Sequence, residues 1–212
     1  QWWSVARASF LTAAEALGKI GDHRAVPALV RALDDSASAV REAAAYSLSQ
    51  CGALDREAGE RLAGLLLDPI PAVRTAAAQG LASLETMGVL WPVVAGYLDD
   101  DDPDIRRNVI RALQGGDAPE LVRALAGHLQ DRDAAVRRAA VVSLGESGVP
   151  VAGVFLHERL TRDSSPAVRA EAAYRLQFFD GREGLQDLKR TAEQDEHPQV
   201  RRWAEQTLRG LH

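Results

Sequence analysis

The chain has 212 residues, of which 46% are hydrophobic but only 5% aromatic, and it carries a net charge of −5. The negative charge argues against a general nucleic-acid-binding surface, the single cysteine excludes an internal disulfide framework, and no apolar run approaches the roughly 18 residues of a membrane span. We expect a cytoplasmic protein, and the start at Gln1 instead of Met leaves room for a processed segment or a module of a longer chain.

One phrase recurs along the chain: an apolar residue followed by arginine, with a leucine eight positions after the apolar residue. Successive copies are 33, 32, 31, 32 and 32 residues apart. A fixed period of this length indicates stacked repeats, which form one elongated body instead of separate domains. The apolar anchors and their leucines are Val40 and Leu48, Val73 and Leu81, Ile105 and Leu113, Val136 and Leu144, Val168 and Leu176, and Val200 and Leu208.

Each copy predicts a pair of helices, which we call the first and the second helix of a repeat. In the second helix, the residues 0, 3, 4, 7 and 8 positions from the anchor lie on one face of a 3.6-residue period. The predicted first helices span 24–33, 55–67, 89–98, 118–129, 150–161 and 182–193. The predicted second helices span 4–17, 38–50, 71–84, 103–114, 134–146, 166–178 and 198–209.

Glycines and prolines at the ends of these segments support the division of each repeat into two helices. Glycines mark the returns between helices, and in four copies a proline stands two positions before the anchor, where the first turn of a helix tolerates it. No stretch shows the alternation of a strand. The sequence therefore predicts an all-α fold, an α-solenoid of stacked antiparallel helix pairs with about six and a half repeats, as a single domain over 1–212.

Aspartate and arginine recur in register with the repeat. An aspartate stands five positions before each anchor and therefore six positions before each arginine. We predict that these residues form a ladder of hydrogen bonds within and between repeats, so that the arginines are structural and not a nucleic-acid-binding stripe. The ladder residues are Asp35 and Arg41, Asp68 and Arg74, Asp100 and Arg106, Asp131 and Arg137, Asp163 and Arg169, and Asp195 and Arg201.

The phrases "DHRAVPALVRALDD" and "AVREAAAYSL" closely resemble the consensus of HEAT repeats, in the short form called HEAT-like or bilin-lyase-type. The resemblance covers essentially the whole chain and implies a right-handed superhelix. The first copy departs from the pattern, because it has Ser4 and Phe10 at the ladder positions and is preceded by Trp2 and Trp3. We interpret it as an edge repeat whose tryptophans cover the end of the stack.

Positions 2, 5, 6 and 9 after each anchor are predicted to face away from the core, and the resemblance implies that they line the concave side. Ile110 and Val141 are expected to be exposed there beside arginines. Arginine and tyrosine are enriched at binding hot spots, and exposed apolar side chains mark interaction surfaces. The predicted partner is therefore a protein or peptide with acidic and apolar features, bound by Tyr46, Gln79, Arg107, Arg111, Arg138, Val142 and Tyr174.

Chemistry-bearing motifs are sparse. A His-Glu dipeptide, the pair that holds iron in some helical stacks, occurs once, at His157-Glu158, and the acidic run over 99–102 lacks the spaced ligands of a calcium loop. We predict no catalytic residue, no metal and no cofactor, and hence a non-enzymatic scaffold for protein interactions. Two alternatives come from the resemblance: a bilin lyase or isomerase acting on a phycobiliprotein, and a HEAT-like nucleic-acid-binding protein.

Overall fold

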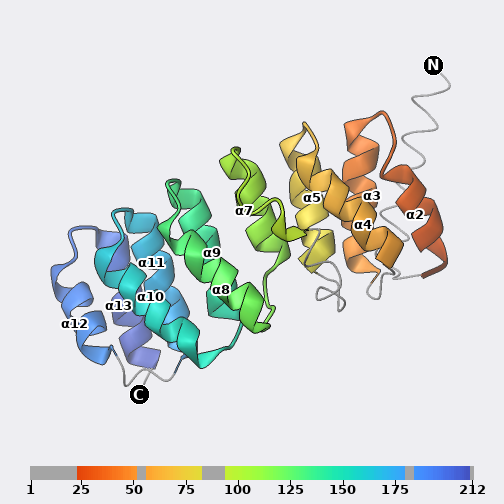
Figure 1. Cartoon of the computed structure of the whole chain (residues 1–212). Helices are drawn as coiled ribbons and strands as arrows, with labels where there is room; N and C mark the ends of the chain where they lie inside the picture. The colour runs from red at the N-terminus through yellow and green to blue at the C-terminus, as the bar shows by residue number, and fades with distance from the viewer. Residues whose placement is uncertain (1–22, 52–55, 83–93, 180–183, 211–212) are drawn as a thin grey trace. The chain divides into compact units, whose positions relative to one another are not determined.

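A computed structural model describes residues 23–51, 56–82, 94–179 and 184–210 (Figure 1). All the regular secondary structure in these ranges is helical. The degenerate copy predicted over 4–17, the tryptophan pair before it, and residues 89–93 of the first helix predicted over 89–98 lie outside the described residues. The chain divides into two compact units, Gln1–Leu113 and Gln114–His212, which we call unit 1 and unit 2.

The described part of unit 1 contains two helix pairs and one further second helix. The first helices are α2 (Val26–Ala32), which follows the 3-10 turn η1 (His23–Ala25), and α4 (Arg56–Gly64), which ends in the 3-10 turn η2 (Leu65–Leu67). The second helices are α3 (Ser38–Gln50), α5 (Pro71–Ala82) and α7 (Pro103–Ala112). Helices α3, α5 and α7 pack side by side in that order, and α2 packs against both α3 and α4.

Three helix pairs make up the described residues of unit 2. The first helices are α8 (Pro119–Gly127) with the 3-10 turn η3 (His128–Gln130), α10 (Pro150–Arg162) and α12 (Leu185–Gln194). The second helices are α9 (Ala134–Glu146), α11 (Pro166–Arg175) with the 3-10 turn η4 (Leu176–Phe178), and α13 (Pro198–Gly210). Figure 1 shows α9, α11 and α13 in sequence within this unit, each packed on the next.

The repeat phrase explains how these helices begin and pack. Four of the second helices begin with a proline. Proline is tolerated there because the N–H groups of the first turn have no intrahelical acceptor, so the missing N–H costs no hydrogen bond. The anchors Val40, Val73, Val136, Val168 and Val200 are buried, whereas Ile105 is half-buried. The fold is thus the all-α solenoid class that the sequence predicts, built in each unit from stacked helix pairs. No helix among the described residues is long and apolar enough to cross a membrane.

Candidate binding face on the second helices

The ladder aspartates occupy the turn between the two helices of a repeat, and all six make the same local bond. The Oδ1 atom of each accepts a hydrogen bond from the backbone N–H two residues later, at 2.7–2.9 Å. This Asx-type turn redirects the chain into the second helix. Each ladder arginine then donates from Nη1 to the backbone oxygen of the aspartate six residues before it, at 2.6–2.9 Å.

Three ladder arginines also reach the aspartate of the following repeat. The Nε atoms of Arg41, Arg137 and Arg169 donate to Asp68, Asp163 and Asp195 at 2.7, 2.9 and 2.8 Å, and a second nitrogen of each completes a two-point pair. Such bidentate pairs are the strong form of charged hydrogen bond. Arg74 departs from the pattern, because its Nη2 lies 3.4 Å from Asp104 instead of contacting the ladder aspartate Asp100.

The pairs shift the titration of their members. Burial alone would raise the pKa of Asp68, but the hydrogen bonds from Arg41 and from the backbone N–H of Ile70 outweigh it and hold this pKa below its usual value. At Asp195 burial also acts to raise the pKa, and the hydrogen bonds from Arg169 and the N–H of His197 again outweigh it and lower the pKa. These carboxylates therefore stay charged in the folded chain at mildly acidic pH.

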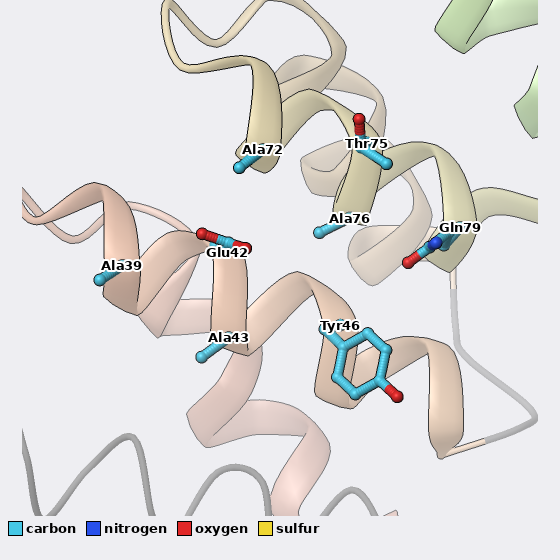
Figure 2. A pocket seen from close by; sticks show the side chains of 8 residues that line it. All are labelled: Ala39, Glu42, Ala43, Tyr46, Ala72, Thr75, Ala76 and Gln79. Carbon is cyan, nitrogen blue, oxygen red and sulfur yellow. The ribbon is translucent and has the colours of Figure 1, made fainter.

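A hollow of about 530 Å³ lies in unit 1 between α3 and α5 (Figure 2). Its lining comes from the positions one before and two, three and six after each anchor, and we call the surface formed by these positions the second-helix face. The lining residues are Ala39, Glu42, Ala43 and Tyr46 from α3, and Ala72, Thr75, Ala76 and Gln79 from α5.

Unit 2 has a hollow of about 450 Å³ at equivalent positions of α9, α11 and α13. Its aromatic wall is Tyr174 packed edge-on against Trp203, with ring centroids 4.8 Å apart, and Phe178 lies edge-on to Tyr174 at 5.8 Å. Phe178 is 61% exposed, so the aromatic surface continues beyond the hollow. The hollow is lined by Arg138, Ala167, Ala170, Glu171, Tyr174, Gln199 and Trp203.

A chain of ion pairs joins α9 to α11 along the lining of this hollow. Arg138 donates to Glu171 from Nε and Nη2 at 3.0 and 2.8 Å, and Glu171 accepts a further bond from Arg175 at 2.9 Å. Arg175 also donates to Glu146 at 2.6 Å, and its guanidinium lies 5.4 Å from the Tyr174 ring centroid. Gly145 makes room for this arrangement, because a Cβ there would lie 2.8–2.9 Å from the side chain of Arg175.

The structure divides the predicted binding residues between the two units. Unit 1 contains Tyr46, Gln79, Arg107 and Arg111, and unit 2 contains Arg138, Val142 and Tyr174. Four of the seven line the two hollows, whereas Arg107 pairs with Asp104 on its own helix at 2.9 Å, and Arg111 is exposed. Val142 is half-buried. The arginines that the sequence grouped as one positive patch belong to two different units, and Arg107 and Arg138 are already paired with carboxylates.

The expectation that Ile110 and Val141 are exposed is wrong, since both are fully buried. The amphipathic pattern assumes that a helix buries one stripe, but α7 packs against the second helix α5, and α9 packs against α11 as well as against the first helices α8 and α10. The buried arc is therefore wider and includes the position five after the anchor, where Ala45, Ala78 and Ala173 are also buried. The position three after the anchor is buried at Ala76, Asn108 and Ala139 but half-buried at Ala43, Glu171 and Trp203.

Among the lining residues that were not predicted to bind a partner, the two carboxylates Glu42 and Glu171 and the ring of Trp203 contribute most to the chemistry of the hollows. Trp203 left a clear signal, because it occupies a position where the other copies carry alanine, asparagine or glutamate. Glu171 could not be predicted from the sequence, because its role depends on its pair with Arg138 of the preceding repeat. Among the described residues, no group of three or more potential metal ligands comes together.

The sequence matches the HEAT-repeat family over residues 11–85, 92–174 and 155–209. The chain belongs to the HEAT-repeat family. It is also 32% identical over 168 residues to the phycocyanobilin lyase subunit alpha of Picosynechococcus sp. (strain ATCC 27264 / PCC 7002 / PR-6), a match that covers 72% of this chain and 60% of that protein. The prediction that the chain is not an enzyme is contradicted by this relative, which is a subunit of a lyase.

Solved structures show the same fold. A HEAT-like repeat protein from Thermococcus onnurineus NA1 superposes with a TM-score of 0.55 at 14% identity, over 95% of this chain and 92% of that one. An engineered protein superposes with a TM-score of 0.55 at 20% identity, over 88% of this chain and 96% of that one. At such identities the likeness concerns the fold alone.

Proposed function

We propose that this HEAT-repeat protein is a bilin lyase-type subunit, which binds an open-chain tetrapyrrole and acts with a phycobiliprotein. The observation that carries the proposal is the 32% identity to a phycocyanobilin lyase subunit. The chain spans 60% of that relative's length, so the proposal concerns the repeat portion that the two share.

The unit 2 hollow has the chemistry that a bilin requires. A bilin is a flat conjugated molecule with propionate carboxylates, so it is bound by aromatic side chains and by guanidinium or other N–H donors. Tyr174, Trp203 and the exposed Phe178 supply the aromatic surface. Among the described residues, Nη1 of Arg138, the indole N–H of Trp203 and the amide of Gln199 make no hydrogen bond and are available to a ligand.

The geometry of the ion pairs favours Arg138 as the propionate ligand. Glu171 holds the Nε and Nη2 side of this guanidinium, which fixes its orientation at the rim of the hollow while 56% of the side chain stays exposed. A site that is held in place before the ligand arrives loses less entropy on binding. The hollow's volume of about 450 Å³ lies in the range of small-ligand sites.

Mixing the full chain with phycocyanobilin tests this proposal. The visible absorbance of the bilin should shift and sharpen, because a bound tetrapyrrole adopts one conformation instead of many. A phycobiliprotein subunit stripped of its bilin is then added, and chromophore that stays with this acceptor after denaturation is measured with and without the chain. A bilin spectrum that the chain leaves unchanged, together with an unchanged yield of acceptor-bound chromophore, would overturn the proposal.

We further propose that the second-helix face holds the protein partner, since an enzyme subunit that acts on a phycobiliprotein must contact it. The residues proposed for this contact remain Tyr46, Gln79, Arg107, Arg111, Arg138, Val142 and Tyr174. The specific support is exposure: Tyr46 is 47% exposed in unit 1, and Phe178 extends the aromatic surface of unit 2. Large aromatic side chains of this kind are the usual anchors of protein interfaces.

A further inference from the structure

The unit 1 hollow differs in chemistry from the hollow of unit 2. Four of its eight lining residues are alanines, and its one charged residue is a carboxylate, Glu42. Figure 2 shows the Glu42 side chain rising from α3 into the space between α3 and α5, with Tyr46 one turn further along the same helix. Residues four apart lie on the same side of a helix, so the carboxylate and the ring border one space.

Neither group is used by the fold. Among the described residues, the Glu42 carboxylate has no hydrogen bond and no ion pair. The ring of Tyr46 also lacks a partner: the side chain is 47% exposed, and no other ring or cation of the described residues packs on it. The ladder residue Arg41, next to Glu42 in sequence, is committed to Asp68 and to the turn at Asp35, so it does not neutralise Glu42.

We propose that this hollow binds a lysine or arginine side chain presented by a protein partner. The cationic group lies against the Glu42 carboxylate and over the Tyr46 ring, and the methylene stem lies on the alanines between the helices. Guanidinium and ammonium groups are attracted both to carboxylates and to the faces of tyrosine rings, while their stems cover apolar surface. The three features of the hollow match the three parts of one basic side chain.

Other occupants satisfy the hollow less well. A carboxylate-bearing group, such as the propionate of a bilin, would be repelled by Glu42. A purely apolar side chain would cover the alanines but would remove water from an unpaired carboxylate, which costs free energy without compensation. The site lies in unit 1, whereas the proposed bilin donors lie in unit 2. Either proposal can therefore fail while the other stands.

Three five-residue peptides test the inference directly. Each is acetylated, amidated and composed of alanine, except for a central residue that is arginine, norleucine or glutamate. Each is titrated into the full chain labelled with ¹⁵N. The arginine peptide should bind most tightly and shift the amide signals of Glu42, Tyr46 and Thr75, and its binding should weaken as salt rises. Norleucine keeps the apolar stem without the charge and should bind more weakly, and glutamate should not bind there.

Substitutions at the hollow separate the carboxylate from the ring. Glu42→Gln should weaken binding of the arginine peptide about threefold to fivefold and remove its advantage over norleucine. Tyr46→Leu should weaken it about twofold to fivefold, while Tyr46→Phe, which keeps the ring, should leave it nearly unchanged. Glu57→Gln on α4 is the matched control, since Glu57 is an exposed carboxylate outside the hollow and its loss should have no effect.

The site assignment is wrong if the norleucine or glutamate peptide binds as tightly as the arginine peptide. It is equally wrong if Glu42→Gln and Glu57→Gln weaken binding by the same factor, because the attraction would then be a general effect of an acidic chain. Shifts confined to unit 2, around Trp203, would also overturn it. Circular dichroism of each variant confirms that the helices are intact before binding is compared.

Discussion

At the scale of single residues, the turn aspartate explains most of the repeat. Its side chain closes the turn by accepting a backbone N–H, its backbone oxygen holds the arginine of its own repeat, and in three repeats its carboxylate holds the arginine of the preceding repeat. The period of the sequence predicts where these residues stand. It does not predict which oxygen each arginine contacts, because both contacts fit the same spacing, and it does not predict that Arg74 contacts Asp104.

Removing one ladder carboxylate should destabilise the fold far more than removing an exposed one. Asp68→Asn should lower the free energy of unfolding by about 1–3 kcal/mol, because it weakens a two-point pair at a residue that is only 7% exposed. Asp34→Asn is the matched control: Asp34 also pairs with an arginine 27 residues away, but both side chains are largely exposed. Its loss should cost less than about 0.5 kcal/mol.

Urea denaturation followed by circular dichroism measures both changes. Equal losses for Asp68→Asn and Asp34→Asn would show that burial of the ladder pair contributes nothing, which would contradict the structural role of the ladder.

Two glycines make a second matched comparison. Gly145→Ala should destabilise the chain by about 1–3 kcal/mol, since the new methyl group overlaps the first atoms of the Arg175 side chain. Gly127→Ala should stabilise it by about 0.4–1 kcal/mol, because Gly127 has a helical backbone conformation and open space around its Cα atom. Thermal unfolding of the two variants checks the opposite signs. A stabilising Gly145→Ala would mean that Arg175 does not cross α9 at this point.

At the scale of helices, the repeat period predicts more than the amphipathic pattern does. Prolines and anchors place the starts of the second helices correctly, because both have a fixed relation to the first turn. Helix ends are less predictable, because no residue type predicts the 3-10 turns η2, η3 and η4. The amphipathic pattern was also wrong at Ile110 and Val141, since a single period cannot tell a helix that packs only against a first helix from one that also packs against a neighbouring second helix.

Acid should weaken the ion pairs that join one helix pair to the next. Asp68 and Asp195 have pKa values below the unfolded value of about 3.9, so the unfolded chain takes up protons at a higher pH than the folded chain does. Their contribution to stability is complete above that unfolded value and is lost as pH falls through the lower pKa of the folded state. The free energy of unfolding should therefore decrease as pH is lowered below about 4.

Urea titrations at a series of pH values measure this dependence. Arg41→Gln should reduce the slope, because without its guanidinium the pKa of Asp68 moves back toward the unfolded value. Arg61→Gln, which removes the exposed partner of Asp34, should leave the slope unchanged. A free energy of unfolding that rises on acidification would contradict the direction of these pKa shifts.

At the scale of the whole molecule, the sequence alone identified the fold but not the activity. The period predicts a solenoid because six successive copies obey it, whereas a ligand site depends on residues that differ from copy to copy, such as Trp203 and Glu42. The lack of a recognisable catalytic or metal-binding motif argued for a scaffold without enzymatic activity, and the relatedness to a lyase subunit corrects that argument. A binding face made of helix surfaces has no sequence motif. Its chemistry could be described only from the structure, which shows which side chains of neighbouring repeats lie next to one another.

The central claim is that the unit 2 hollow binds a bilin, and an absorbance titration of the full chain with phycocyanobilin across three proteins tests it most directly. Wild type should bind with a saturable spectral shift. The double variant Arg138→Gln, Trp203→Leu should weaken binding at least about tenfold, since a charged hydrogen bond of about 1.5–3 kcal/mol and an aromatic contact are both lost. Arg123→Gln, which removes a 76% exposed arginine of α8 outside the hollow, should bind like wild type. Equal affinity in all three proteins would contradict the account.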